Sequence, residues 1–176
     1  MKKINLLFMA IAVLTSCGVT DVEPKVLEID GEQAQLNVGY IGDWGTNDDL
    51  TYRQYELTFA DVADHPSNYL SFDVFSTSTL RLQEGTYYYD NSYESGAITN
   101  VITGKNIEYD AGGKAVAGLR LSDWTWDYSG SVTISMEADI YTFEFDLTAE
   151  KDDQTHTIKG EFTELLEEGW ISTKKK

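Results

Sequence analysis

The chain is poor in the residues that usually build crosslinked, zinc-binding or nucleophilic sites. Its 176 residues include one cysteine, Cys17, so no internal disulfide can form. The two histidines, His65 and His156, lie far apart and in no nucleophile motif or zinc-ligand spacing. Thirty acidic residues could supply carboxylate pairs for glycoside hydrolysis, but at that abundance pairs arise by chance. We therefore expect a protein that is not an enzyme.

Positive charge is also scarce. Thirteen lysines and arginines face thirty acidic residues, which gives a formal net charge of −17. A domain this acidic repels the phosphates of nucleic acids, so we expect no nucleic-acid partner. The same charge disfavours docking of the domain body on anionic lipid head groups. The acidic surface is sufficiently explained by solubility.

The sequence after Cys17 lacks any amphipathic helical run of useful length, and apolar residues alternate with polar ones instead. In residues 35–41 the alternation predicts a strand with Leu36, Val38 and Tyr40 on one face. Further strands are expected at 50–59, 69–75, 80–89 with a bulge or bend at Gly85, 97–102, 106–109, 131–136, 141–147 and 155–165.

The last three of these strands give the strongest fold prediction. Short polar connections separate them, as in an antiparallel meander whose apolar face must cover another sheet or close on itself. We therefore expect an all-β fold, a single antiparallel β-sandwich or barrel of about 8–10 strands, spanning residues 33–172. Alternation alone does not separate a sandwich from a barrel. The basic tail, 173–176, is expected to be solvated.

The N-terminus has the pattern of a secretory signal. Lys2 and Lys3 precede an apolar run at residues 4–14 that is too short to span a bilayer. The following Leu14-Thr15-Ser16-Cys17 resembles the lipobox of bacterial lipoproteins. That resemblance implies removal of residues 1–16 and acylation of Cys17, which would anchor the chain to a membrane. Loss of the two lysines would make the net charge about −19.

Residues 17–32 read as the lipidated cysteine and a flexible tether, because polar and structure-breaking residues dominate. Asp21 and Glu23 follow the lipobox closely, which resembles the surface-export signal of lipoproteins in Bacteroidota-type bacteria, although Val22 splits the acidic cluster. The resemblance implies an outer-membrane lipoprotein of the cell envelope, facing the periplasm or the cell surface.

Aromatic residues supply the first candidate site. A regular strand through residues 124–128 would place Trp124, Trp126 and Tyr128 on one side, as a platform for sugar rings with Asp123 and Asp127 available for hydroxyl groups. The same rings are equally suited to fill the core. Tyr88, within the tyrosine run 87–89, and Trp44 are further candidate ligand contacts.

A polar loop supplies a second candidate, for calcium. Asp43, Asn47, Asp48 and Asp49 offer hard oxygen ligands, and the glycines of the loop allow the backbone to wrap around an ion. Their spacing matches no EF-hand loop, and polar turns have this composition without a metal. No other cofactor is expected.

Together these observations predict a lipid-anchored outer-membrane binding protein, with a polysaccharide ligand bound through exposed aromatic side chains. The alternative is a structural or assembly component that binds an outer-membrane protein partner. A hydrolase that uses carboxylates is the third possibility.

Overall fold

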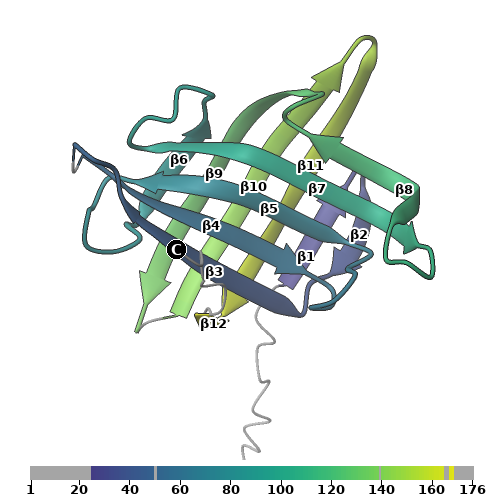
Figure 1. The fold of residues 1–176 in the computed structure, drawn as a ribbon, viewed down its shortest axis with the longest axis horizontal. Coiled ribbons are helices and arrows are strands. Elements are labelled where there is room, and N and C mark those ends of the chain that lie inside the picture. Colours follow the sequence, from purple (N-terminus) through teal and green to yellow (C-terminus); the bar gives the residue numbers. More distant parts are fainter. Residues whose placement is uncertain (1–24, 50, 139, 165–166, 169–176) are drawn as a thin grey trace, which may run out of the picture.

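A computed structural model describes residues 25–49, 51–138, 140–164 and 167–168, which form an all-β domain made of one strongly curled sheet (Figure 1). The described residues contain no helix that is long and apolar enough to cross a membrane. The strands are β1 (Lys25–Ile29), β2 (Glu32–Gln35), β3 (Val38–Thr46), β4 (Arg53–Ala60), β5 (Tyr69–Ser76), β6 (Gly85–Tyr89), β7 (Ala97–Tyr109), β8 (Ala115–Ser122), β9 (Asp127–Glu137), β10 (Ile140–Lys151), β11 (Gln154–Glu164) and β12 (Glu167–Glu168).

The strand order is β12-β3-β4-β5-β7-β6-β9-β10-β11-β1-β2, and β8 pairs with β7 outside this path. Pairing is antiparallel except between β6 and β7 and between β12 and β3. Because the sheet curls strongly, β3, β4, β5 and β7 form a front layer that crosses β9, β10 and β11 behind it (Figure 1). The expected all-β fold is confirmed.

The core lies between these two layers and is centred on Phe59 of β4. Its ring centroid lies 4.9 Å from that of Phe143, 5.2 Å from that of Phe145 and 4.8 Å from that of Phe162. Tilted aromatic pairs at such distances contribute about 0.5–1.5 kcal/mol each beyond the area that they bury. A single side chain therefore joins the front layer to β10 and β11.

The C-terminal meander is confirmed. Strands β9, β10 and β11 pair in sequence order, with Phe143 opposite both Ile134 and Phe162. Phe143, Phe145 and Leu147 of β10 are buried while Glu144 and Asp146 between them are exposed, as period-two alternation requires.

The predicted tether is too long. Residues 25–35, most of which it included, form β1, a turn at Asp30-Gly31 and β2. Leu27 and Ile29 are buried, and β1 pairs with β11 along its whole length, so the sheet itself orders this segment. The domain therefore begins at or before Lys25. The predicted signal peptide at 1–16, residues 17–24 including Cys17, and the tail at 173–176 lie outside the described residues.

The predicted face of β3 is also wrong. Leu36 is buried, but Tyr40 lies opposite Thr58 on the outer face, whereas Ile41 lies opposite the buried Leu57. The reason is a break at Leu36-Asn37 between β2 and β3, which resets the alternation.

Three other strand predictions need correction. Residues 97–109 form one bulged strand, not two short ones, and Gly85 begins β6 rather than bending a longer strand. Strand β8 was not predicted because most of its side chains are exposed and do not alternate. With β1, β2 and β12, it brings the number of described strands to twelve, above the predicted 8–10.

Candidate functional site

The outer face of the front layer carries a hollow of about 320 Å³. Strand alternation produces its floor, because Tyr55, Leu57, Phe72 and Val74 point into the core and their neighbours point outward. We call this the Asp73 hollow, and its lining residues are Trp44, Gln54, Glu56, Ser71, Asp73, Asn100 and Ile102.

Asp73 is the chemically distinctive residue of this hollow, since it is a carboxylate only 8% exposed. Its Oδ2 accepts hydrogen bonds from Gln54 Nε2 at 3.0 Å and from Asn100 Nδ2 at 2.6 Å. Burial raises the pKa of Asp73, and the negative charge of Glu56 raises it further, while the two amide donors partly oppose the shift. Glu56 lies directly opposite Asp73 in the pairing of β4 with β5.

A bulge in β7 brings Asn100 to Asp73. Ser71 pairs with Ile102 and Asp73 with Thr99, so β7 has one more residue than β5 over this stretch. Asn100 takes a φ of 52°, a left-handed conformation that asparagine tolerates better than most residues. The bulge lets the side chain of Asn100 reach the outer face while Ile98 and Val101 both stay in the core.

A second irregularity, in β3, positions Trp44. The register between β3 and β4 shifts between Asp43 and Gly45, and Gly45 has a φ of 86°. Asp43 accepts hydrogen bonds from Arg53 Nε at 2.9 and 3.1 Å and from the Gly45 N–H at 2.8 Å. The Arg53 guanidinium thereby holds the pKa of Asp43 below its ordinary value. Trp44, 46% exposed, is left at the side of the hollow.

These contacts bear on the predicted calcium loop. Strand β3 continues to Thr46, so Asp43 lies in a strand and not in a loop, and its carboxylate binds Arg53. Asn47 Oδ1 accepts hydrogen bonds from the backbone N–H groups of Thr51 and Tyr52. Asp48 and Asp49 are exposed. Among the described residues, no group of three histidine, cysteine or acidic side chains is placed to hold a metal ion. Calcium at this loop stays a prediction, and it would have to displace Arg53.

The predicted row of three aromatic rings is wrong. Trp124 and Trp126 lie in the turn between β8 and β9, so regular alternation does not extend to them. Trp124 is 78% exposed, whereas Tyr128 is 6% exposed and packs in the core. Trp126 is partly buried, with its ring centroid 5.1 Å from that of His156.

Tyr88 on β6 is 65% exposed while its neighbour Tyr87 is buried, as expected for alternate faces. Neither Tyr88 nor Trp124 lines the Asp73 hollow. Of the aromatic candidates, the structure places Trp44 there.

His156 lies at the junction of β11 with the β1–β2 turn. Its Nδ1 is 2.7 Å from Asp30 Oδ2, and the Thr157 N–H donates to Asp30 Oδ1 at 3.0 Å. Burial opposes the ionised form of Asp30, but these contacts outweigh it and lower the pKa of the carboxyl. The pair fastens the hairpin to the meander, in keeping with a structural role for His156.

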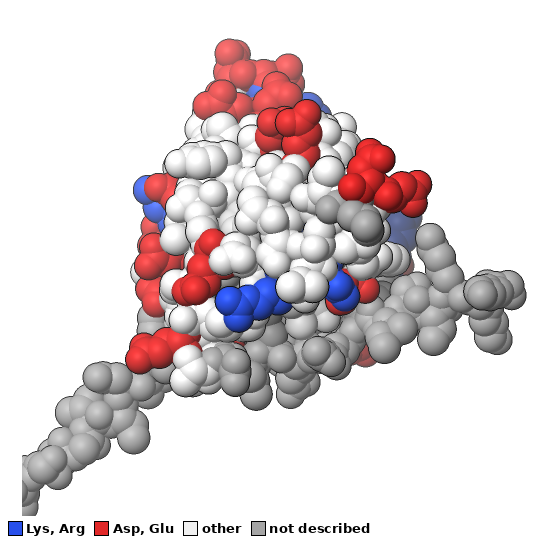
Figure 2. All heavy atoms as spheres, turned by 90° about the vertical axis from the view of Figure 1, so that its left-hand side faces the viewer, with Lys and Arg blue, Asp and Glu red and all other residues white. Residues whose placement is uncertain are grey.

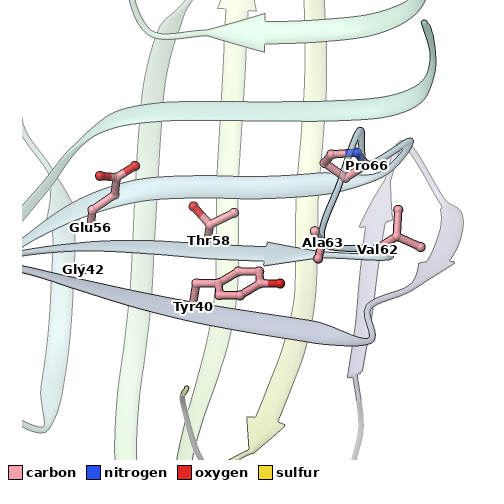
Figure 3. A pocket seen from close by; sticks show the side chains of 8 residues that line it. Tyr40, Gly42, Glu56, Thr58, Val62, Ala63 and Pro66 are labelled. Atoms are coloured by element: carbon pink, nitrogen blue, oxygen red, sulfur yellow. The ribbon is translucent and has the colours of Figure 1, made fainter. Parts of the chain in front are cut away.

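A second, smaller hollow of about 180 Å³ lies farther along β4 (Figure 3). The side chains of Tyr40, Thr58 and Glu56 stand on the outer face of β3 and β4 there, and Val62, Ala63 and Pro66 lie beyond the end of β4. We call it the Tyr40 hollow, lined by these residues with Gly42 and Ala60. Glu56 belongs to both hollows.

The charge of the domain is unevenly spread. Figure 2 shows one end of the molecule, with acidic side chains at its tip and along its margins, a few lysine and arginine side chains beside acidic ones in its lower part, and a largely uncharged surface between. Both hollows contain acidic side chains, and neither is lined by lysine, arginine or histidine.

Sequence reasoning missed Gln54, Asp73 and Asn100 as site residues. A signal was present, because Gln54 and Glu56, like Ser71 and Asp73, are polar residues at alternate positions of strands with an apolar opposite face. The pairing that brings the strands together is not visible in the sequence. Comparisons of the chain with family models, with curated proteins and with solved structures found no match.

Proposed function

We propose that this domain binds a glycan in the Asp73 hollow and is held at the outer membrane by lipids on Cys17. The observation that carries the proposal is the environment of Asp73. Its carboxylate is nearly buried, accepts hydrogen bonds from two side-chain amides and lies in a hollow beside the exposed Trp44. Ligand sites typically combine an apolar surface, which Trp44 supplies here, with a few convergent polar groups.

The chemistry of these groups suits sugar hydroxyls. The carboxylates of Asp73 and Glu56 accept hydrogen bonds, the amides of Gln54 and Asn100 both donate and accept, and Ser71 contributes a hydroxyl. The Trp44 ring offers an apolar face to the C–H side of a sugar ring. Because Asp73 and its amide partners are already hydrogen-bonded together, little side-chain ordering is left to oppose binding.

Binding is tested with the purified full-length protein in mild detergent, titrated calorimetrically with neutral polysaccharides. We expect a saturable heat that Trp44→Ala and Asp73→Ala each weaken at least tenfold, the usual effect of removing a central anchor. Trp124→Ala is the matched control, since it removes an exposed tryptophan outside the hollow. Equal loss in the control, or no binding by the parent protein, would refute the glycan site.

The anchor is tested separately. Cys17→Ala should leave the precursor uncleaved and without incorporated radiolabelled fatty acid. Normal maturation of this variant would contradict lipidation, and it would leave the glycan proposal standing because the two rest on different parts of the chain.

A second function, assembly with an outer-membrane protein, is favoured by the edges of the sheet. Within the described residues, β2 pairs only with β1 and β8 only with β7, so each has an edge that another strand can extend. Val116 on β8 is also exposed. Stoichiometric copurification of a membrane protein, lost when β8 is disrupted by Ala117→Pro but retained in Asp73→Ala, would support this function.

A further inference from the structure

We infer that the Asp73 hollow and the Tyr40 hollow form one groove along β4, and that this groove binds a linear, uncharged glycan chain several sugars long. The inference deepens the proposed glycan-binding function and rests on it.

The two hollows adjoin each other on the outer face. Glu56 lines both, and the hydroxyl oxygen of Thr58, in the Tyr40 hollow, lies 2.8 Å from that of Ser71, in the Asp73 hollow. The outward-facing residues of β4, from Gln54 to Ala60, line first the Asp73 hollow and then the Tyr40 hollow. Six residue steps at about 3.3 Å each give a length of about 20 Å, which is more than one sugar ring can fill.

The groove has an aromatic side chain toward each end. Tyr40 stands opposite Thr58. Trp44 lies in the β3 bulge between Asp43, which is opposite Tyr55, and Gly45, which is opposite Gln54, and it lines the Asp73 hollow together with Gln54 and Glu56. Four residue steps along β3 separate them by about 13 Å. Gly42 lies between the rings, opposite Glu56, and has no side chain to divide the groove. Two separated rings match a chain that stacks a different sugar on each.

The ends of the groove differ in polarity. Carboxylates and amides gather around Asp73, whereas Val62, Ala63 and Pro66 give the Tyr40 end an apolar wall (Figure 3). We therefore assign hydroxyl recognition, together with stacking on Trp44, to the first end, and stacking on Tyr40 beside an apolar wall to the second.

Charge restricts the type of chain. Glu56 sits where the hollows meet, Asp73 lies beside it, and no cationic side chain lines either hollow. A polysaccharide of uronic acids would place like charges next to these carboxylates and be repelled. An uncharged chain pays no such penalty.

The experiment measures affinity as a function of chain length. Full-length protein in mild detergent is titrated with linear glucans, mannans and xylans and with fragments of each from monosaccharide to hexasaccharide. For the class that binds, we expect the hexasaccharide to bind at least tenfold more tightly than the disaccharide.

Variants locate the two ends. Tyr40→Ala should lower the ratio of hexasaccharide affinity to disaccharide affinity, while Tyr40→Phe, which keeps the ring, should restore that ratio. Trp44→Ala should weaken binding at every length. Tyr88→Ala removes an exposed tyrosine outside the groove and serves as the control. Circular dichroism checks that each variant is folded.

The outcomes separate the two proposals. If neither a neutral nor an acidic glycan binds, the proposed function fails. If a glycan binds but affinity does not rise with length, or Tyr40→Ala behaves like the parent protein, the glycan site stands and the groove is refuted. Tighter binding of an acidic polysaccharide than of any neutral one would refute the charge assignment.

Discussion

Asp73→Asn should make the protein more stable at neutral pH. The substitution keeps an oxygen that can accept the hydrogen bonds from Gln54 and Asn100, and removes a negative charge that is buried and faces Glu56. Burial raises the pKa of Asp73, which means that the ionised carboxylate is disfavoured in the folded state.

The size of the effect follows from two contributions. Like charges directly opposite across two strands cost roughly 0.2–1 kcal/mol, and partial desolvation of the carboxylate adds to this. We expect a net gain of about 1 kcal/mol in the free energy of unfolding, which is equivalent to about 2–4 °C in Tm for a domain of this size.

The gain should depend on pH with a definite sign. Because the pKa of Asp73 is raised on folding, the folded parent protein holds its proton to higher pH than the unfolded chain. Parent stability therefore falls as the pH rises from the ordinary carboxyl value through the raised one. The advantage of Asp73→Asn should be small at acidic pH, where Asp73 is protonated in both states, and complete at neutral pH.

Thermal unfolding followed by circular dichroism, at acidic and at neutral pH, measures both effects. Glu108→Gln is the control, because it neutralises an exposed carboxylate on β7 that lies opposite the uncharged Ala117. A loss of stability in Asp73→Asn at neutral pH, or a gain that is the same at both pH values, would refute the reasoning. Weakened glycan binding in the more stable variant would show that Asp73 serves a ligand at the expense of the fold.

Three further predictions concern packing and the framework of the site. Phe59→Ala should cost about 3–5 kcal/mol in chemical denaturation, because it empties the contact between the layers, whereas an unchanged midpoint would contradict its central position. Arg53→Gln should cost at most about 1 kcal/mol. It should nevertheless weaken glycan binding, measured by calorimetry, because the bulge that positions Trp44 loses the guanidinium that binds Asp43. Unchanged affinity would show that this salt bridge does not support the binding site. Asp30→Ala should speed amide hydrogen exchange in β1 and β2 while β10 stays protected, and uniform exchange would contradict a local fastening role.

The sequence predicted the fold class because alternation survives where strands are long and one face is buried. Residues 141–147 show this, and their apolar residues all face the core side. Prediction failed where alternation was interrupted. The Leu36-Asn37 break reversed the face of Tyr40. Strand β7 runs without a break through residues 103–105, which separate the two predicted strands, and its pairing with β8 is irregular between Lys105 and Glu108.

The candidate site was harder to predict because it depends on pairing between strands far apart in the sequence. Asp73 and Asn100 are 27 positions apart, and only the bulged register of β5 with β7 brings the amide to the carboxylate. Trp44 was identified from its residue type. Tyr128 lies in the core, and a turn ahead of β9 separates it from Trp124 and Trp126. That turn contains no glycine or proline, so the sequence gives no sign of it.

The early start of β1 limits how far the domain can stand from a membrane. Eight residue steps connect Cys17 to Lys25, and a fully extended chain covers about 29 Å over that distance. A lipid on Cys17 would thus hold the domain within roughly its own width of the bilayer. Since β1 pairs with β11 in the rear layer, the outer face of β3, β4 and β5 lies on the opposite side of the domain from β1. A protein held in this way would bind glycan chains that pass close to its own membrane and not distant ones.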